Sequence, residues 1–243
     1  MTQHPFLSII VPAYNEEDRL PQSLNKILQF IQEQDYISEI ILVENGSHDR
    51  TLEIARAFSA HFSMVKVFHE SQKGKGLAVK TGMLQAGGDY RFICDVDLSM
   101  PVEDINRFLP PAVSDADVAI ASREAPGAQR FDEPEYRHLI GRVFNTLVKL
   151  IALPGLQDTQ CGFKCFKGDV AERLFPHLTI TGWTFDVELL FMARKLGYRI
   201  REIPIHWYYH PHSKVHVLRD SLRMSLDLLR IRWNSIRNLY NFD

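Results

Sequence analysis

The first hundred residues alternate short apolar runs with segments in which apolar residues recur every three or four positions. The first run covers residues 6–11, and leucine and isoleucine then recur at helical spacing from Leu20 to Ile31. The same alternation predicts further strands at 39–43, 65–68 and 90–94 and further helices at 51–62 and 77–85. Since strands that alternate with helices are typical of parallel pairing, we expect a mostly parallel sheet covered by helices on both faces.

The second half of the chain follows the pattern less strictly. Strands are predicted at 117–122 and 201–206, and helices at 137–153 and 185–195. Residues 124–129 contain Pro126 and Gly127 and are interpreted as a mobile loop that could act as a lid. We find no internal repeat, and one large domain is the default expectation for a chain of this length.

Composition and charge exclude several classes of protein. The 243 residues are 45% hydrophobic and 24% charged, which is ordinary for a globular chain. The net charge of −2 argues against nucleic acid as a partner. Three cysteines without a CxxC pair argue against a disulfide framework or a zinc site and fit a reducing cytosol. No apolar run approaches the roughly 18 residues of a membrane span, so we expect the chain not to cross a bilayer.

Polar residues cluster where three of the predicted strands end, which is the edge at which open parallel sheets bind ligands. The clusters cover residues 12–16, 44–49 and 95–97. Asp95 and Asp97 would repel each other at the end of a buried strand unless a cation, a proton or nearby donors offset their charge. Mg²⁺ or Mn²⁺ would do so, since such an ion takes one or two carboxylates and completes its shell with water and phosphate oxygens. Two solvated carboxylates are the alternative.

The other polar clusters carry weaker signals. Residues 12–16 and 44–49 could form a floor for a base and a ribose, although Asn, Gly, Ser and Asp also favour ordinary turns. Lys73-Gly74-Lys75-Gly76 opens a predicted helix and offers backbone N–H groups and two cations to an anion. The run lacks the spacing of a P-loop, and no GxGxxG follows the first strand, which disfavours a Rossmann-type dehydrogenase.

Taken in order, these motifs resemble those of glycosyltransferase family 2, whose catalytic domain has the GT-A fold. The matching runs are Pro12-Ala13-Tyr14-Asn15-Glu16, Glu44-Asn45-Gly46-Ser47-x-Asp49, Lys75-Gly76, Asp95-x-Asp97 and Ser122-Arg123. Residues 158–164 and 183–190 resemble the branch that holds dolichyl-phosphate glucosyltransferases and mannosyltransferases, and they favour the glucosyltransferase side. The resemblance covers nearly the whole chain. It implies an α/β fold of the GT-A (Rossmann-like) type, a nucleotide-sugar-binding sheet flanked by helices, with a C-terminal amphipathic helix.

The resemblance also implies roles for the matching residues. The implied nucleotide pocket consists of Pro12, Tyr14, Glu16, Glu44, Asp49, Lys75 and Asp95. Asp95 and Asp97 would hold Mg²⁺ or Mn²⁺ together with the donor diphosphate. Two departures bear on specificity, because many relatives have Asp-Asp where this chain has Glu44-Asn45, and mannosyltransferase relatives often carry Gln at the position of Ser99. The first departure leaves the donor base open.

A polyprenyl phosphate is the acceptor that the resemblance implies. A phosphate is already ionised near neutral pH, so it needs Arg or Lys rather than a general base. The candidate cations are Arg123, Arg137, Arg142 and Lys214, each of which could instead be a solvated surface charge.

The candidate catalytic residues are Asp97, Arg123 and Asp186. Asp186 could bind a sugar hydroxyl, act as a base towards an alcohol acceptor, or simply favour the positive end of its helix. Because Asp186 and Glu188 are two apart in a predicted helix, we expect at most one of them to face the site.

The C-terminal segment predicts an amphipathic helix. Its apolar positions are Leu218, Leu222, Leu226, Leu229, Trp233, Ile236 and Tyr240, and its basic positions are Arg219, Arg223, Arg230 and Arg237. The apolar stripe could lie on an anionic membrane or pack on the domain core or on a second subunit, and the helix at 139–153 could serve equally. We therefore divide the chain into a catalytic domain at 1–216 and an extension at 217–243. The expected location is cytoplasmic, peripheral on the inner face of the membrane.

These features favour an inverting, metal-dependent hexosyltransferase that uses UDP-glucose, with GDP-mannose as the second donor, and a polyprenyl phosphate. A family 2 enzyme with a soluble saccharide acceptor is the second hypothesis. A nucleotide-sugar-binding protein without turnover is the third, and a homo-oligomer is compatible with each.

Overall fold

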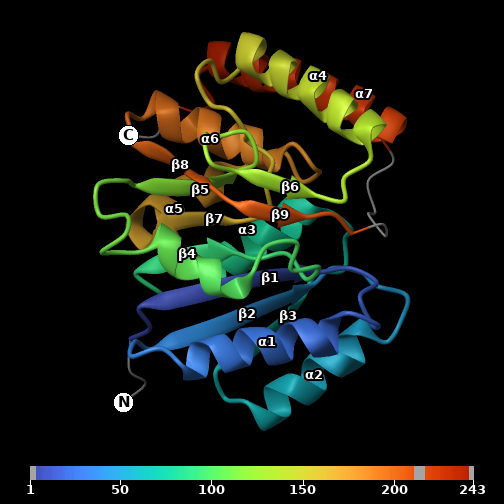
Figure 1. The fold of residues 1–243 in the computed structure, drawn as a ribbon, viewed down its shortest axis with the longest axis vertical. Coiled ribbons are helices and arrows are strands. Elements are labelled where there is room, and N and C mark those ends of the chain that lie inside the picture. The colour runs from blue at the N-terminus through green and yellow to red at the C-terminus, as the bar shows by residue number, and fades with distance from the viewer. Residues whose placement is uncertain (1–3, 211–216, 241–243) are drawn as a thin grey trace.

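The structure, a computed structural model, describes residues 4–210 and 217–240. Its first half contains β1 (Leu7–Ala13), α1 (Leu20–Gln32), β2 (Ser38–Glu44), α2 (Thr51–His61), β3 (Val65–His69), α3 (Lys75–Gln85), β4 (Tyr90–Ile93) and the 3₁₀-helix η1 (Val102–Phe108). Its second half contains β5 (Val118–Ser122), β6 (Gln129–Phe131), α4 (Glu135–Ile151), β7 (Lys164–Lys167), α5 (Gly168–Leu174), η2 (Phe175–His177), α6 (Phe185–Lys195), β8 (Ile200–Pro204), β9 (His206–Tyr208) and α7 (Val217–Ile236). Figure 1 shows a central sheet with helices packed against it, so the predicted α/β class is confirmed.

The large sheet has seven strands in the order β3-β2-β1-β4-β7-β5-β8. β1 pairs in parallel with β2 and β4, and β5 pairs in parallel with β8, as predicted for a mostly parallel sheet. β7 is the exception, because it lies antiparallel between β4 and β5. Sequence analysis missed this strand because it is four residues long and begins and ends with a lysine, so it contains no clear apolar run.

Two hydrophobic layers cover the two faces of the sheet. Ile10 of β1 packs in one layer with Met83 of α3, and Ile9 packs in the other with Leu24 of α1. This division follows from the two-residue period of a strand, which points neighbouring side chains to opposite faces. At Gly82, a Cβ atom would lie 2.5 Å from Cγ2 of Ile10, so α3 can approach β1 this closely only with glycine there. The close packing fixes the position of α3 against the strand ends.

A small second sheet forms beside β5. The segment predicted as a loop at 124–129 ends in β6, and the Gln129 amide donates a 3.0 Å hydrogen bond to the Ile205 carbonyl. β6 pairs in parallel with β9. The strand predicted at 201–206 is therefore two strands, because β8 follows β5 only as far as Pro204, the Ile205 amide donates a last hydrogen bond of 3.3 Å to the Ser122 carbonyl, and the chain then pairs with β6. The mobility of 124–129 stays a prediction.

The C-terminal helix α7 packs on the body of the protein through a face that sequence analysis did not select. Met224, Leu228 and Ile231 are buried in the same hydrophobic layer as residues of α3 and α6. The predicted apolar stripe lies on the other side and is exposed from Leu222 to Ile236, whereas Tyr240 is buried. Among the described residues, no helix is long and apolar enough to cross a membrane. The division at residue 216 stays a prediction.

Candidate active site

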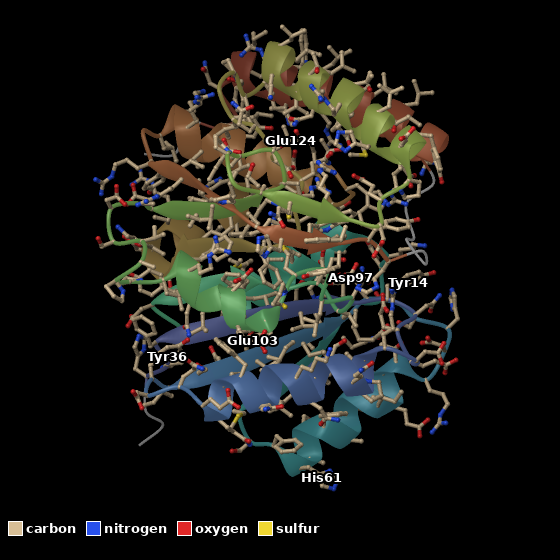
Figure 2. All side chains as sticks on the ribbon, in the orientation of Figure 1. Tyr14, Tyr36, His61, Asp97, Glu103 and Glu124 are labelled. Carbon is tan, nitrogen blue, oxygen red and sulfur yellow. The ribbon has the colours of Figure 1, made fainter. Side chains whose placement is uncertain are left out.

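A cleft of about 710 Å³ opens at the carboxyl ends of the strands. Its volume is in the range of sites that hold small molecules. Residues from all three polar clusters line it, together with residues of α4, α6 and α7. Figure 2 labels two of them, Tyr14 and Asp97, which lie near one another at this edge of the sheet. The prediction that chemistry gathers where the strands end therefore agrees with the position of the cleft.

The residues predicted for the nucleotide fall into two groups, and the first lines the cleft. Pro12, Tyr14, Glu16, Lys75 and Asp95 all do so. Nζ of Lys73 lies 4.0 Å from the centre of the Tyr14 ring, a distance at which a cation is attracted by the face of an aromatic ring. This wall of the cleft combines an aromatic face with carboxylate oxygens, which suits a base and a ribose.

The second group, Glu44 and Asp49, is not among the residues that line the cleft. Glu44 is buried, accepts a hydrogen bond from the Ser47 amide, and lies 2.6 Å from Nδ1 of His69. Asp49 accepts hydrogen bonds from Thr51 and, at 3.1 Å, from the Glu17 amide. Both carboxylates therefore hold the loops that form the wall, and direct contact with a nucleotide stays a prediction for each.

Asn15 and Asn45 tie these loops together, which sequence analysis did not anticipate. Asn15 has a φ of 50°, a left-handed conformation that asparagine tolerates better than most residues, and its side chain accepts a 2.9 Å hydrogen bond from the His48 amide. Asn45 lines the cleft, and its Nδ2 donates a 2.8 Å hydrogen bond to the Gly74 carbonyl. The loops after β1 and β2 and the start of α3 are thus linked directly.

Asp95 and Asp97 follow β4 and face the cleft beside Lys75. Nζ of Lys75 lies 2.8 Å from the Asp95 carboxylate. Burial works against the charge of this lysine, but attraction by Asp95 and then by Asp186 outweighs it, so the pKa of Lys75 is raised. The lysine is therefore held as a cation against the paired carboxylates.

The surroundings of Asp95 fit a divalent ion. A Cβ atom at Gly162 would lie 2.4 Å from Oδ2 of Asp95, so glycine keeps the space beside that oxygen open. No group of three or more His, Cys, Asp or Glu side chains that could enclose a metal is found among the described residues. Two carboxylates on an open cleft match an ion such as Mg²⁺ or Mn²⁺, which leaves most coordination positions to water and phosphate oxygens. The donor set fits an ion that is bound together with a diphosphate.

Asp186 lies in the cleft wall at the start of α6 and is held by a buried lysine. Nζ of Lys164 donates a 2.8 Å hydrogen bond to Oδ2 of Asp186 and a second one to the Cys161 carbonyl. Lys164 is 1% exposed, so its charge has little water to stabilise it and depends on this carboxylate. Oδ1 of Asp186 is buried and has no hydrogen-bond partner among the described residues, which is unusual for a carboxylate oxygen. One oxygen is therefore held by Lys164, and the other is a buried acceptor in the wall of the cleft.

Glu188 plays a different part from Asp186. It is fully buried and accepts hydrogen bonds from the Thr179 hydroxyl, the Ile180 amide and the Tyr240 hydroxyl at 2.6, 2.7 and 2.6 Å. Glu188 does not line the cleft. The structure thus agrees with the expectation that at most one of the two acids faces the site.

Arg123 lines the cleft but is paired with a buried acid. Its guanidinium makes two hydrogen bonds to Asp158, of 2.7 and 3.0 Å, and lies 5.4 Å from the centre of the Trp207 ring. Burial opposes the charge of both groups, yet their attraction outweighs it, so that the pKa of Asp158 is lowered to about 2 and that of Arg123 is raised. Arg123 is therefore a rigid donor with part of its charge already compensated.

The other cations predicted to hold the acceptor differ in whether they line the cleft. Arg137 lines the cleft and lies 5.1 Å from the centre of the Tyr209 ring. Arg142 is exposed on α4 and is not among the lining residues. Lys214 lies outside the described residues. Of the two that the structure describes, Arg137 is placed where the prediction needs it and Arg142 is not.

Several lining residues were not predicted as site residues. They are Arg19, Asn45, Lys73, Gln160, Trp183, Trp207, His210, Asp220, Arg223 and Asp227. Gln160 and Trp183 stood in the motifs used for the resemblance and could have been selected. The three α7 residues could not, because which face of α7 meets the body depends on tertiary packing.

The chain shares its fold with the solved structures of two synthases. The glucosyl-3-phosphoglycerate synthase of Mycobacterium tuberculosis, in complex with Mn²⁺, uridine diphosphate and glucosyl-3-phosphoglycerate, matches with a TM-score of 0.70 at 17% identity, over 94% of this chain and 78% of that chain. The mannosyl-3-phosphoglycerate synthase of Rubrobacter xylanophilus matches with a TM-score of 0.69 at 17% identity, over 96% and 74%. The protein therefore has the GT-A glycosyltransferase fold, which confirms the predicted fold class.

Similarity in sequence narrows this class. Residues 8–175 match the family "Glycosyl transferase family 2", a segment that contains all five motifs from Pro12 to Arg123. The chain belongs to glycosyltransferase family 2 and is a glycosyltransferase, as the resemblance predicted. The "Dolichyl-phosphate beta-glucosyltransferase" of Dictyostelium discoideum is 32% identical over 97% of this chain and 76% of that protein. The proteins of that name from Drosophila melanogaster and Homo sapiens are 35% and 32% identical, each over 93% of this chain and 74% of theirs.

Proposed function

We propose that this chain transfers glucose from UDP-glucose to a polyprenyl phosphate, with inversion at the anomeric carbon. The observation that carries the proposal is one cleft in which the paired carboxylates Asp95 and Asp97 lie together with the cations Arg123 and Arg137. The carboxylates suit a metal-bound diphosphate and the arginines suit an anionic acceptor. The names of the three relatives, all dolichyl-phosphate beta-glucosyltransferases, support both glucose and a polyprenyl acceptor.

UDP is the proposed donor nucleotide. A glucosyl transferase of the same fold has been solved with UDP-glucose and Mn²⁺, which supports this choice without fixing it. Tyr14 and Lys73 form the wall proposed for the base, and Glu16 that for the ribose. GDP-mannose is the alternative donor, because Asn45 faces the cleft where many relatives carry an acid.

Asp95 and Asp97 are the residues proposed to hold Mg²⁺ or Mn²⁺. Such an ion would neutralise charge that develops on the departing diphosphate. Lys75 holds Asp95 in place and supplies a further positive charge at the same point of the cleft. We therefore propose Lys75 as a ligand of the diphosphate.

The proposed acceptor determines the chemistry. One oxygen of the acceptor phosphate forms the new bond to the anomeric carbon, while the bond from that carbon to the diphosphate oxygen breaks and UDP leaves with the electron pair. An ionised phosphate needs no proton removed, so no general base is required. Arg123 and Arg137 hold the acceptor anion, with Arg142 and Lys214 as further candidates. Asp186, which lines the cleft, accepts a hydrogen bond from a donor sugar hydroxyl and orients the sugar.

The acceptor lipid sets the location that we propose. The enzyme acts in the cytoplasm as a peripheral protein on the inner face of the membrane. Residues 1–216 are proposed to carry the catalytic domain and residues 217–243 to form an extension that meets the membrane.

Radiolabelled sugar transfer to a short polyprenyl phosphate tests the proposal, with UDP-glucose and GDP-mannose compared in Mg²⁺, Mn²⁺ and EDTA. We expect labelled lipid from UDP-glucose with either ion and none with EDTA. Labelled lipid from GDP-mannose alone would assign the other donor. Hydrolysis of the donor without labelled lipid would replace the polyprenyl phosphate by a soluble saccharide acceptor.

A further inference from the structure

Exposed apolar side chains are concentrated on two helices. Of the thirteen large apolar side chains that are exposed among the described residues, nine lie on α4 and α7, and these nine are between 58 and 78% exposed. They are Tyr136, Leu139, Val143 and Leu150 of α4, and Leu222, Leu226, Leu229, Trp233 and Ile236 of α7. We call these nine residues the α4–α7 apolar face. Single exposed apolar residues are normal, but a cluster of this size usually marks an interaction surface.

The two helices form the outer edge of the molecule. They contact each other and lie side by side at the top of Figure 1, where no other described helix or strand lies beyond them. α7 is attached through its opposite side, on which Met224, Leu228 and Ile231 are buried. With 3.6 residues per turn, Leu222, Leu226, Leu229 and Trp233 fall about 180° from that buried side. Packing on the body therefore does not explain the outer stripe, which would be free to meet a partner.

Charge on α7 identifies the kind of partner. Arg223, Arg230, Arg232 and Arg237 are exposed. Asp220 is 8% exposed, and Asp227 pairs with Thr184 of the body at 2.9 Å. The outward side of α7 thus carries apolar and basic side chains without an exposed acid. A second copy of the chain docked on the same face would bring arginine against arginine, whereas an anionic lipid surface complements both features.

The same helices reach the cleft. Arg223 and Met224 of α7 and Arg137 of α4 line it. A surface that touches the outer side of α7 would therefore lie next to the cleft.

We propose that the α4–α7 apolar face docks on an anionic lipid bilayer and sets the acceptor side of the cleft against the headgroup layer. The docking rests on the proposed function for its purpose, since a lipid-linked phosphate would then enter from the headgroup layer without leaving the membrane. Its own physical basis is the exposed apolar area and the arginines beside it.

Vesicle co-sedimentation tests the docking independently of catalysis. The full chain is mixed with phosphatidylcholine vesicles containing about 30% phosphatidylglycerol and no polyprenyl phosphate. The double variant Leu226→Glu, Trp233→Glu is expected to bind at least about 10-fold more weakly, since two large apolar side chains leave the interface. The matched control is Ile37→Glu, Leu84→Glu, which changes two exposed apolar residues elsewhere, 43 and 42% exposed, and should bind like the unaltered chain. Equal binding by both double variants would overturn the proposal.

Charge and activity give two further outcomes. Arg230→Gln with Arg237→Gln should weaken binding to anionic vesicles about 5-fold for each charge removed, and should have little effect with phosphatidylcholine alone. Transfer to a water-soluble, short-chain prenyl phosphate should be unchanged in all these variants. If that transfer fails in the unaltered chain as well, the proposed function is wrong while vesicle binding still stands. A lipid-free dimer that dissociates in Leu226→Glu, Trp233→Glu would show instead that the face joins two copies.

Discussion

The two sides of the cleft are built differently. On the donor side, the loops after β1 and β2 are fixed by several hydrogen bonds to backbone groups, among them those made by Asn15, Glu44 and Asp49. On the acceptor side, the Arg123 guanidinium is held by Asp158 and lies near the Trp207 ring, and Arg137 lies against the Tyr209 ring. The contacts on the donor side therefore fix loop backbone, whereas those on the acceptor side fix individual side chains.

This difference agrees with the two ligands proposed. A nucleotide sugar has many polar groups in fixed positions, so loops held in advance lower the cost of ordering the site. A polyprenyl phosphate offers one charged group at the end of a flexible chain, and a few cations beside a membrane are enough to hold it. Substitutions on the donor side should accordingly lower turnover, and those on the acceptor side should change the KM of the acceptor.

The largest effect is expected at Asp97. Asp97→Asn should lower turnover by more than about 1000-fold, since one of the two carboxylates proposed to hold the ion loses its charge. The melting temperature should change little, because Asp97 faces the cleft and does not pack in the core. Binding of Mn²⁺ measured by electron paramagnetic resonance should weaken in parallel. The control Asp18→Asn, an exposed acid, should behave like the unaltered chain, and normal turnover in Asp97→Asn would remove the ion from this site.

The pair of Lys164 and Asp186 lies where the two sides meet and should give the next largest effect. Lys164→Met removes the partner of a buried carboxylate, so we expect the free energy of unfolding to fall by about 3–5 kcal/mol. Turnover should fall about 100-fold as Asp186 loses its orientation. Lys164→Arg should recover part of both losses.

A double variant separates positioning from general damage. Lys164→Met with Asp186→Asn removes both charges of the pair, so its free energy of unfolding in urea should lie above that of Lys164→Met alone. If the losses in free energy of unfolding of the two single variants simply add in the double variant, the lysine and the acid act independently.

Sequence patterns predicted the structure well where it follows from the local spacing of apolar residues, and failed where it depends on tertiary contacts. β1 and β2 were found because each is a buried apolar run followed by a helix. β7 was missed because it is four residues long with a lysine at each end, and the role of Lys164 was missed because a lysine buried beside an acid has no sequence signature. The same limit applies to α7, because the predicted apolar positions from Leu222 to Ile236 are exposed and another face of the helix packs on the body.

On the acceptor side, the pairing of Asp158 with Arg123 should contribute about 2 kcal/mol to the free energy of unfolding, and acid should remove this contribution. Asp158 has a pKa of about 2 in the folded protein, below its ordinary value of 3.8. A lowered pKa stabilises the fold above the ordinary value, and this stability is lost as the pH falls from about 4 to about 2. In urea unfolding, Asp158→Asn should be less stable at neutral pH and should lose roughly 2 kcal/mol less over that interval. The control is Asp115, an exposed acid that pairs with Arg201. Asp115→Asn should lose about as much stability over this pH interval as the unaltered chain.

The smallest effect, and the most specific, is expected at Arg137. It is five residues from Arg142 on α4, about 140° round the helix, so the two cations cannot face the same ligand. Only Arg137 lines the cleft. Arg137→Gln should raise the KM for polyprenyl phosphate about 10-fold and leave the KM for the donor unchanged, because one charge-assisted contact to a phosphate is lost. Arg142→Gln should change either KM less than about 2-fold, and equal effects of the two substitutions would mean that α4 meets the acceptor through its general positive charge rather than through one placed side chain.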